Sequence, residues 1–326
     1  MQWFSNVIGA GQGGAGGVRL LSMLTACWCL AISLFALALP ASAHAAVLSL
    51  DAPESTGDGK PFVVTVTADG PGDVVLDWRG QAVTVPVAAD ASGAGRTSTW
   101  TGQAILAVPL DAKPGRETLR ARAAGQPKAA PGVTRAIAVV RAAYPEQRLT
   151  VEGKYVNPDK AALDRHEAER ARVKAALALR TPERLWALPM ARPVPGEVSS
   201  LFGLRRVFNG EPRAPHRGLD LRGAAGEPVA ACASGRVVLA ENHYFAGNSV
   251  YIDHGMGVVS MYFHLSAMDV APGQMVARGQ VIGRVGSTGR VTGPHLHFGM
   301  AVLGDMVDPQ VLLENAPGST GATTRE

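Results

Sequence analysis

Gly293-Pro294-His295-Leu296-His297-Phe298 is the stretch that decides the fold of this chain, because histidines alternate with apolar residues directly after a turn signal. Successive side chains of a β-strand point to opposite faces, so His295 and His297 share one face and Leu296 and Phe298 the other. Such alternation is typical of a half-buried sheet with one face in the core and one face lining a groove. The stretch therefore predicts a strand that carries two histidines into a groove.

A second strand with the same alternation is expected from Val258 to His264. Its two faces hold Val259, Met261 and Phe263 on the apolar side and Ser260, Tyr262 and His264 on the other. We expect the apolar side to lie in the core and the side with His264 to line the groove.

His216-Arg217-Gly218-Leu219-Asp220 brings two more polar candidates to the same place. Pro215 before this segment and Gly218 within it let the backbone turn, so that His216 and Asp220 can converge on one ion. A catalytic zinc keeps three protein ligands from His, Asp or Glu and leaves a fourth position for water or substrate. Four histidines and one aspartate exceed that number. The surplus favours a catalytic site, in which two histidines move protons or stabilise charge.

Residues 1–45 have the pattern of a secretory signal peptide. They contain one charged side chain, Arg19, followed by the apolar run from Leu20 to Leu39, Pro40 and a small-residue cleavage site that ends at Ala45. We expect cleavage there and export of the chain. An uncleaved segment of this length would instead anchor the protein in a membrane.

The remaining length predicts two folded units and a connection. Short strand-like runs separated by Gly, Pro and Asp over residues 46–143 predict an immunoglobulin-like β-sandwich accessory domain. Residues 144–191 are expected to form a linker with a helix over about 159–179, because that stretch has no Gly or Pro. Residues 192–314 are expected to form a second β-rich domain with every candidate named above. The small polar residues 315–326 are expected to be disordered.

The remaining residues with reactive side chains are expected to lie outside the site. His166 is predicted to be solvated on the helix and His254 to lie in a turn. His243 is predicted to lie in an exposed loop or, alternatively, at the border of the groove. Cys232 stands among alanines, which favours a small buried residue. The net charge of +4 without a Lys/Arg cluster does not indicate nucleic acid as a partner, although it suits an anionic polymer.

Residues from about Arg192 to Leu313 resemble the M23 metallopeptidases, the lysostaphin and LytM-like family of peptidoglycan endopeptidases. The resemblance rests on H-x-x-x-D, H-x-H and the intervening histidine, and on segments such as Ser199-Ser200-Leu201-Phe202-Gly203. It implies an antiparallel, barrel-like catalytic domain with one zinc ion. By position in the motifs, it implies that the ligands are His216, Asp220 and His297 and that the catalytic residues are His264 and His295.

The resemblance also implies an activity, namely hydrolysis of peptide bonds in peptidoglycan stems or cross-bridges by a metal-activated water. His264 and His295 would divide proton transfer and charge stabilisation, and the sequence leaves open which does which. The signal peptide and the Ala-rich accessory domain favour a Gram-negative periplasm and D,D cross-links. Peptidoglycan is the expected partner, and a regulatory protein partner stays open.

Three other interpretations compete with this one. A non-catalytic regulator of other cell-wall hydrolases would show replacements at the ligand positions, and none is replaced. Residues Ala271 to Gly283 resemble the hairpin of biotinyl and lipoyl carrier domains, but the last lysine of the chain is Lys174, so attachment is excluded. In the third, the first domain covers the groove until a partner or a cleavage releases it.

Overall fold

The computed structural model describes residues 46–90, 99–150, 158–212 and 214–314. The predicted signal peptide (1–45) and the predicted disordered tail (315–326) lie outside these residues. The described part is mainly β, as predicted. Within that part, no helix is both long enough and apolar enough to cross a membrane.

The first β-region is a hydrogen-bonded sheet with the order β1-β3-β6-β5-β4-β7-β8-β2. Its described strands are β1 (Val47–Asp51), β2 (Ser55–Gly57), β3 (Pro61–Ala68), β4 (Gly72–Trp78), β5 (Gln81–Ala89), β6 (Trp100–Ala107), β7 (Gly115–Ala123) and β8 (Val133–Val140). β5 pairs with β4 along most of its length and with β6 only at Ala88 and Ala89. The Phe62 ring of β3 lies 5.4 Å from the Trp78 ring of β4, although these strands are not paired. Two groups of strands therefore pack together, and the immunoglobulin-like topology stays a prediction.

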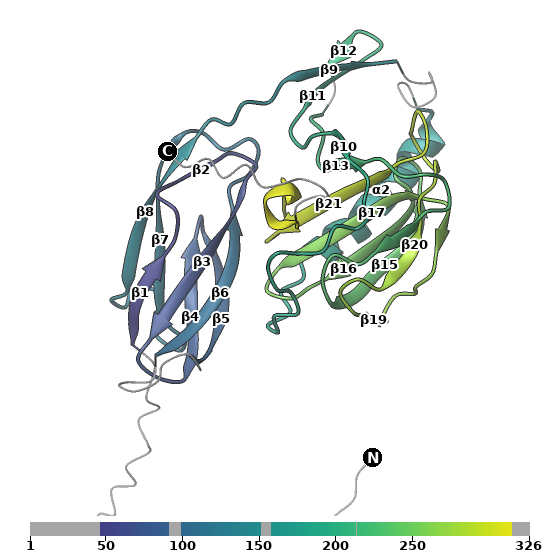
Figure 1. Cartoon of the computed structure of the whole chain (residues 1–326). Helices are drawn as coiled ribbons and strands as arrows, with labels where there is room; N and C mark the ends of the chain where they lie inside the picture. The colour runs from purple at the N-terminus through teal and green to yellow at the C-terminus, as the bar shows by residue number, and fades with distance from the viewer. Residues whose placement is uncertain (1–45, 91–98, 151–157, 213, 315–326) are drawn as a thin grey trace, which may run out of the picture. The chain divides into compact units, whose positions relative to one another are not determined.

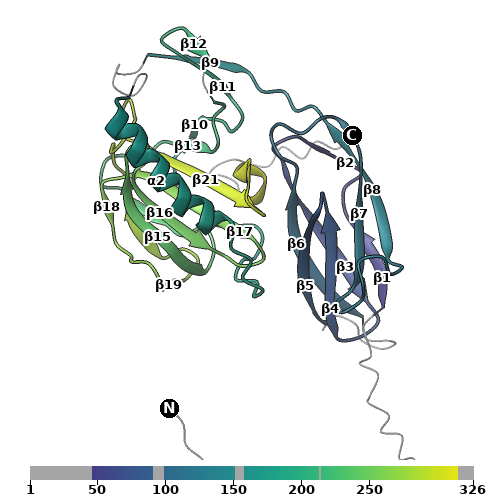
Figure 2. The ribbon, with the colours of Figure 1, turned by 180° about the vertical axis from the view of Figure 1, so that it is seen from behind.

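The helix α2 (Lys160–Leu177) agrees closely with the predicted range. The Asp159 side chain caps it by accepting a hydrogen bond from the Ala162 N–H at 2.8 Å. α2 lies across one face of the second sheet (Figure 2). Val173 and Leu177 pack there against the buried cluster of Tyr251, Val259, Met261 and Ala301. The helix thus covers a face of the sheet for which the sequence pattern alone predicted no partner.

The second β-region contains the predicted site. Its main sheet has the order β10-β13-β21-β17-β16-β15-β19, with β22 beside β21 (Figure 1). The strands of this sheet are β10 (Val198–Ser200), β13 (Leu219–Leu221), β15 (Gly235–His243), β16 (Gly247–Asp253), β17 (Val258–Leu265), β19 (Met275–Val276), β21 (Leu296–Val302) and β22 (Asp305–Val307). Two smaller sheets and a 3-10 helix complete the region: β9 (Glu146–Leu149), β11 (Arg205–Phe208) and β12 (Glu211–Pro212); β14 (Pro228–Ala230), β18 (Ala267–Met268) and β20 (Val281–Arg284); and η1 (Pro309–Leu312).

The central strands bring distant motifs side by side. β21 lies between β13 and β17, and all three are antiparallel to their neighbours. The register places His297 opposite Asp220 on one side and opposite Phe263 on the other. The H-x-H and H-x-x-x-D motifs therefore meet because their strands are hydrogen-bonded to each other.

The prediction for the faces of β17 was wrong. Ser260 and Tyr262 are fully buried, and the Tyr262 ring packs 5.3 Å from Phe298 in the main core. Phe263 is on the opposite face, which α2 covers and which also carries His297. Both faces of β17 are covered, so the polarity of alternate residues could not tell which face adjoins the site. The Tyr262 hydroxyl tolerates burial because it accepts a hydrogen bond from the Cys232 N–H.

His264 reaches the site by leaving regular strand geometry. Its φ is +65°, in the left-handed region, and the pairing of β16 with β17 shifts between Asn248 and Val250. One extra residue of β17 is accommodated there, which defines a β-bulge. The His264 ring consequently lies 6.0 Å from the His297 ring, whereas regular alternation would have placed these two histidines on opposite faces.

Candidate metal centre

His216, Asp220 and His297 each bring one ligand atom into a common space, and these atoms lie within 4.8 Å of one another. Oδ1 of Asp220 is 3.0 Å from Nε2 of His216 and 2.9 Å from Nδ1 of His297. Two imidazole nitrogens and one carboxylate oxygen are a donor set that catalytic zinc takes in proteins. The residues present therefore fit a zinc ion, and their role as its ligands stays a prediction.

The surroundings of the two histidines orient their rings. Nδ1 of His216 donates to the carbonyl of Leu201 at 2.8 Å, which leaves Nε2 as the nitrogen that faces Asp220. The His297 ring is stacked on Phe263 with an interplanar angle of 1°. It also approaches Gly218 so closely that a Cβ there would lie 2.5 Å from Nε2 of His297. Glycine inside H-x-x-x-D is thus required by the ring of a strand nearly 80 residues away.

Asp220 is held as a carboxylate. Burial disfavours its charge, but the close contacts with the imidazoles of His216 and His297 outweigh burial and keep the pKa of Asp220 below its usual range. Its second oxygen, Oδ2, lies 3.0 Å from Nη2 of Arg206 on β11. Burial lowers the pKa of Arg206, while the Asp220 carboxylate acts to raise it.

His264 and His295, the two predicted catalytic residues, lie beside the three candidate ligands. Their ring centroids are 5.1 Å apart, and Nε2 of His295 is 3.7 Å from Oδ1 of Asp220. Nδ1 of His264 bonds the carbonyl of Thr288 at 2.9 Å, and Nδ1 of His295 bonds that of Gly293 at 2.9 Å. Each ring is therefore held through Nδ1 by a backbone carbonyl, which leaves Nε2 available for proton transfer or for a hydrogen bond to a substrate.

Burial and neighbouring histidines determine the charge of the cluster. Burial, with smaller contributions from His297 and His295, lowers the pKa of His264 to about 3. Burial also lowers the pKa of His297 to about 4, although the hydrogen bond to Asp220 acts in the opposite direction. Both rings are neutral at pH 7, which is the form in which an imidazole can ligate a metal.

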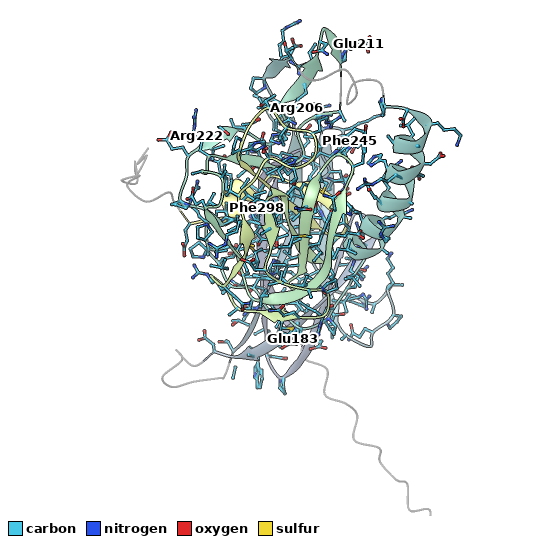
Figure 3. The ribbon with its side chains drawn as sticks, turned by 90° about the vertical axis from the view of Figure 1, so that its right-hand side faces the viewer. Glu183, Arg206, Glu211, Arg222, Phe245 and Phe298 are labelled. Carbon is cyan, nitrogen blue, oxygen red and sulfur yellow. The ribbon has the colours of Figure 1, made fainter. Side chains whose placement is uncertain are left out.

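The cluster lies between two openings. A cleft of about 650 Å³ is lined by Asp220 and His295 together with polar residues that include Arg222 and Glu227. A second, more apolar pocket of about 320 Å³ is lined by His297, Phe245 and residues of α2. Figure 3 shows Arg222 and Phe245 on either side of the upper end of the sheet. His295 therefore lines the polar cleft, whereas His297 lines the apolar pocket.

The predictions for two other histidines were incomplete. His243 is buried at the end of β15 and contacts the Tyr251 hydroxyl at 3.4 Å, so the predicted exposed position was wrong. His254 stands directly before a turn, but it is fully buried and lies 2.7 Å from the Ser260 hydroxyl. Neither belongs to the metal cluster.

Sequence reasoning missed Arg206 and Thr288. Arg206 follows an identical residue, Arg205, and only the strand geometry of β11 shows which of the two points inward. Thr288 holds His264 through a backbone carbonyl, a group that every residue has. No residue-type signal could have identified that contact, whereas alternation along a predicted strand could have separated the two arginines.

Comparison with known proteins agrees with this geometry. Residues 214–309, which include all five site residues, match the family described as Peptidase family M23. The peptidoglycan DD-endopeptidase ShyA of Vibrio cholerae is 43% identical over 130 residues, which are 40% of this chain and 30% of ShyA. The DD-carboxypeptidase/endopeptidase Mpg of Neisseria meningitidis is 41% identical over 125 residues, which are 38% of this chain and 29% of Mpg. The chain therefore spans less than a third of the length of these relatives.

A solved structure extends the likeness beyond the metal site. The crystal structure of a candidate M23 peptidase from Pseudomonas aeruginosa has a TM-score of 0.58 and 32% sequence identity to this chain. The alignment covers 78% of this chain and 95% of that one. The shared fold thus includes more than the 96 residues that match the family.

Proposed function

This chain belongs to peptidase family M23, and on that premise we propose that it is a zinc-dependent endopeptidase that cleaves peptide bonds in peptidoglycan, at D,D cross-links. The observation that carries the proposal is the convergence of a His-Asp-His cluster with two further histidines beside a polar cleft. The name of ShyA supports the substrate, and the names of ShyA and Mpg both support the D,D specificity.

The donor atoms of His216, Asp220 and His297 would hold the zinc ion. Zinc supplies Lewis acidity and brings the pKa of water close to neutrality. Nδ1 of His264 is held by the carbonyl of Thr288, so its Nε2 is the nitrogen that could accept a proton from the attacking water. His295 lines the cleft, where its Nε2 is suited to hydrogen-bond developing charge on the substrate or to protonate the leaving amine.

The same proposal places the protein in the cell envelope. A signal peptide over residues 1–45 would export the chain, and peptidoglycan would be its partner there. Regulation by a protein partner or by the first β-region is a separate part of the proposal. Digestion of peptidoglycan by the chain alone does not test it.

Digestion of purified peptidoglycan of defined chemistry tests the activity. We expect the chain to convert cross-linked fragments into monomers at the D,D bond, as shown by mass spectrometry. A zinc chelator should abolish the conversion, added zinc should restore it, and His297→Ala should remain inactive with zinc present. Cleavage that a chelator leaves unchanged, or no cleavage of any cross-link, would contradict the proposal. Stimulation of a second hydrolase without cleavage would favour the regulator instead.

A further inference from the structure

The two oxygens of the Asp220 carboxylate have different partners, and Arg206 contacts only one of them. Nη2 of Arg206 lies 3.0 Å from Oδ2, while Oδ1 is the oxygen that faces His216 and His297. Both partners are largely buried, with side chains 18% and 13% exposed. In Figure 3, Glu211 marks the far end of the hairpin formed by β11 and β12, and Arg206 of β11 lies nearer the main sheet.

The same guanidinium extends towards a second ligand. Nη2 of Arg206 is 3.5 Å from the Ser200 hydroxyl, which is itself 3.3 Å from Nδ1 of His216. One side chain thus contacts Asp220 directly and reaches the surroundings of His216. Groups that bond metal ligands in this way fix ligand orientation, and their loss reduces metal affinity or activity by roughly 10- to 100-fold.

Stability alone does not account for an arginine at this position. A hydrogen bond to a charged group contributes about 1.5–3 kcal/mol, but a buried donor without a partner costs about 1–3 kcal/mol. The Nε of Arg206 is such a donor, because it is buried without a hydrogen-bond partner among the described residues. The two effects are of similar size, so the contact with Asp220 is better explained by what it does to the carboxylate.

We infer that Arg206 is a positioning residue that holds Asp220 as a one-oxygen ligand of the metal and keeps the remaining coordination position accessible from the cleft. A carboxylate can offer a metal one oxygen or both. Because Oδ2 accepts a charge-assisted hydrogen bond from Arg206, turning the carboxylate so that both oxygens face the metal would strain and weaken that bond. Without Arg206 the carboxylate is free to turn, and its second oxygen competes for the open position. This inference rests on the proposed zinc site.

Metal affinity by itself is a poor test of this role. The positive charge of Arg206 repels a divalent cation, whereas its hydrogen bond orients a ligand, so the two effects on affinity oppose each other. The number of coordinating atoms is the direct readout, because only the orienting effect changes it. Cobalt in place of zinc reports that number through its visible absorption, which weakens as a fourth ligand is joined by a fifth.

The experiment compares Arg206→Met, Arg206→Lys and the control Arg205→Met in the full chain, each loaded with excess cobalt. Arg205 precedes Arg206 on β11 and is exposed. We expect Arg206→Met to show the weaker spectrum of a higher coordination number, and Arg206→Lys and Arg205→Met to match the wild type. With zinc, kcat on a cross-linked fragment should fall about 10- to 100-fold in Arg206→Met with little change in KM.

Identical cobalt spectra for the wild type and Arg206→Met would overturn the inference. Circular dichroism of the metal-free variants checks folding, and Arg206→Gln replaces Arg206→Met if the latter does not fold. A wild-type chain that binds cobalt and zinc but cleaves no cross-link would contradict the proposed function while leaving the spectroscopic comparison valid. The two failures are therefore distinguishable.

Discussion

At the scale of single residues, the backbone at His264 determines what its imidazole can do. A non-glycine residue with positive φ is uncommon, although His and Asn adopt it more readily than most, and such residues cluster at functional sites. The conformation is held because the His264 N–H bonds the carbonyl of Ala246 at 2.9 Å and the ring bonds that of Thr288. The bulge therefore places the ring beside His295 instead of in the core.

Replacing His264 by asparagine removes the imidazole ring but keeps a residue that tolerates the backbone conformation. Asparagine tolerates positive φ, so His264→Asn should fold and bind zinc like the wild type. Its kcat/KM on cross-linked fragments should fall by about 10²- to 10⁴-fold, because a proton-transfer group is lost. His264→Ala should lose the same activity and also about 1–2 kcal/mol of stability. Wild-type activity in His264→Asn would remove this residue from the mechanism.

Gly218→Ala tests whether close packing positions the ligand His297. The added Cβ would lie 2.5 Å from Nε2 of His297 and 2.7 Å from the carbonyl oxygen of Phe298, so the start of β21 must move. We expect zinc affinity to fall by about tenfold or more, as for other losses of ligand support, measured by competition with a chromophoric chelator. Gly115→Ala is the control, because its Cβ would meet nothing within 4 Å. Unchanged zinc affinity in Gly218→Ala would show that the His297 ring can move away from the added Cβ and still bind the metal.

At the scale of elements, α2 is attached to the sheet by a buried charge. The Glu169 carboxylate accepts the N–H of Tyr244 at 3.0 Å and pairs with Arg165 at 2.7 Å, and its side chain is 5% exposed. Val173 and Leu177 add apolar contacts further along the helix. Because α2 lines the apolar pocket that reaches His297, its attachment also shapes the surroundings of the site.

Glu169→Ala should loosen α2 without unfolding the sheet. The Tyr244 N–H would lose this buried acceptor, which costs about 1–3 kcal/mol. Hydrogen–deuterium exchange should show faster exchange in α2 and at residues 243–246, with the amides of β16 and β17 unchanged. Glu167→Ala on the exposed side of the same helix should change the free energy of opening by less than about 0.5 kcal/mol. Equal exchange in both variants would contradict the anchoring role of Glu169.

At the scale of the whole molecule, neutral histidines inside the second β-region link its stability to pH. The folded chain keeps the pKa of His264 at about 3 and that of His297 at about 4, against an ordinary value of 6.5. The unfolded chain therefore binds protons first as the pH falls below 6.5. The Asp220 carboxyl, with its lowered pKa, titrates only at more acidic pH.

The metal-free chain should thus be less stable at pH 5 than at pH 7. The stability that the two neutral histidines contribute is fully present above pH 6.5 and is lost progressively towards pH 3 to 4. Thermal unfolding in the presence of a chelator measures the difference. His264→Asn should show a smaller difference between the two pH values, because one of the two groups is absent. A melting temperature that is equal or higher at pH 5 would contradict the expectation.

Much of this organisation could be predicted from local pattern. The strand from Val258, the strand with His297 and α2 were predicted closely, because alternation and the absence of Gly and Pro act over a few neighbouring residues. Short strands such as β10, β13 and β14 were missed, because two or three residues carry no detectable period. The likeness of H-x-x-x-D and H-x-H to M23 motifs singled out the five site residues, since those motifs are local as well.

The sequence by itself determined which side chains are available: two strands with histidines, a His-Asp segment and a helix without Gly or Pro. The tertiary structure decided which faces they occupy. Pairing with β21 placed Phe263 beside His297, a bulge brought His264 to the same side, and β11 turned Arg206 rather than Arg205 towards Asp220. The physical reason is that hydrogen-bonding register and backbone conformation depend on partners far away in the chain, whereas residue type and spacing do not.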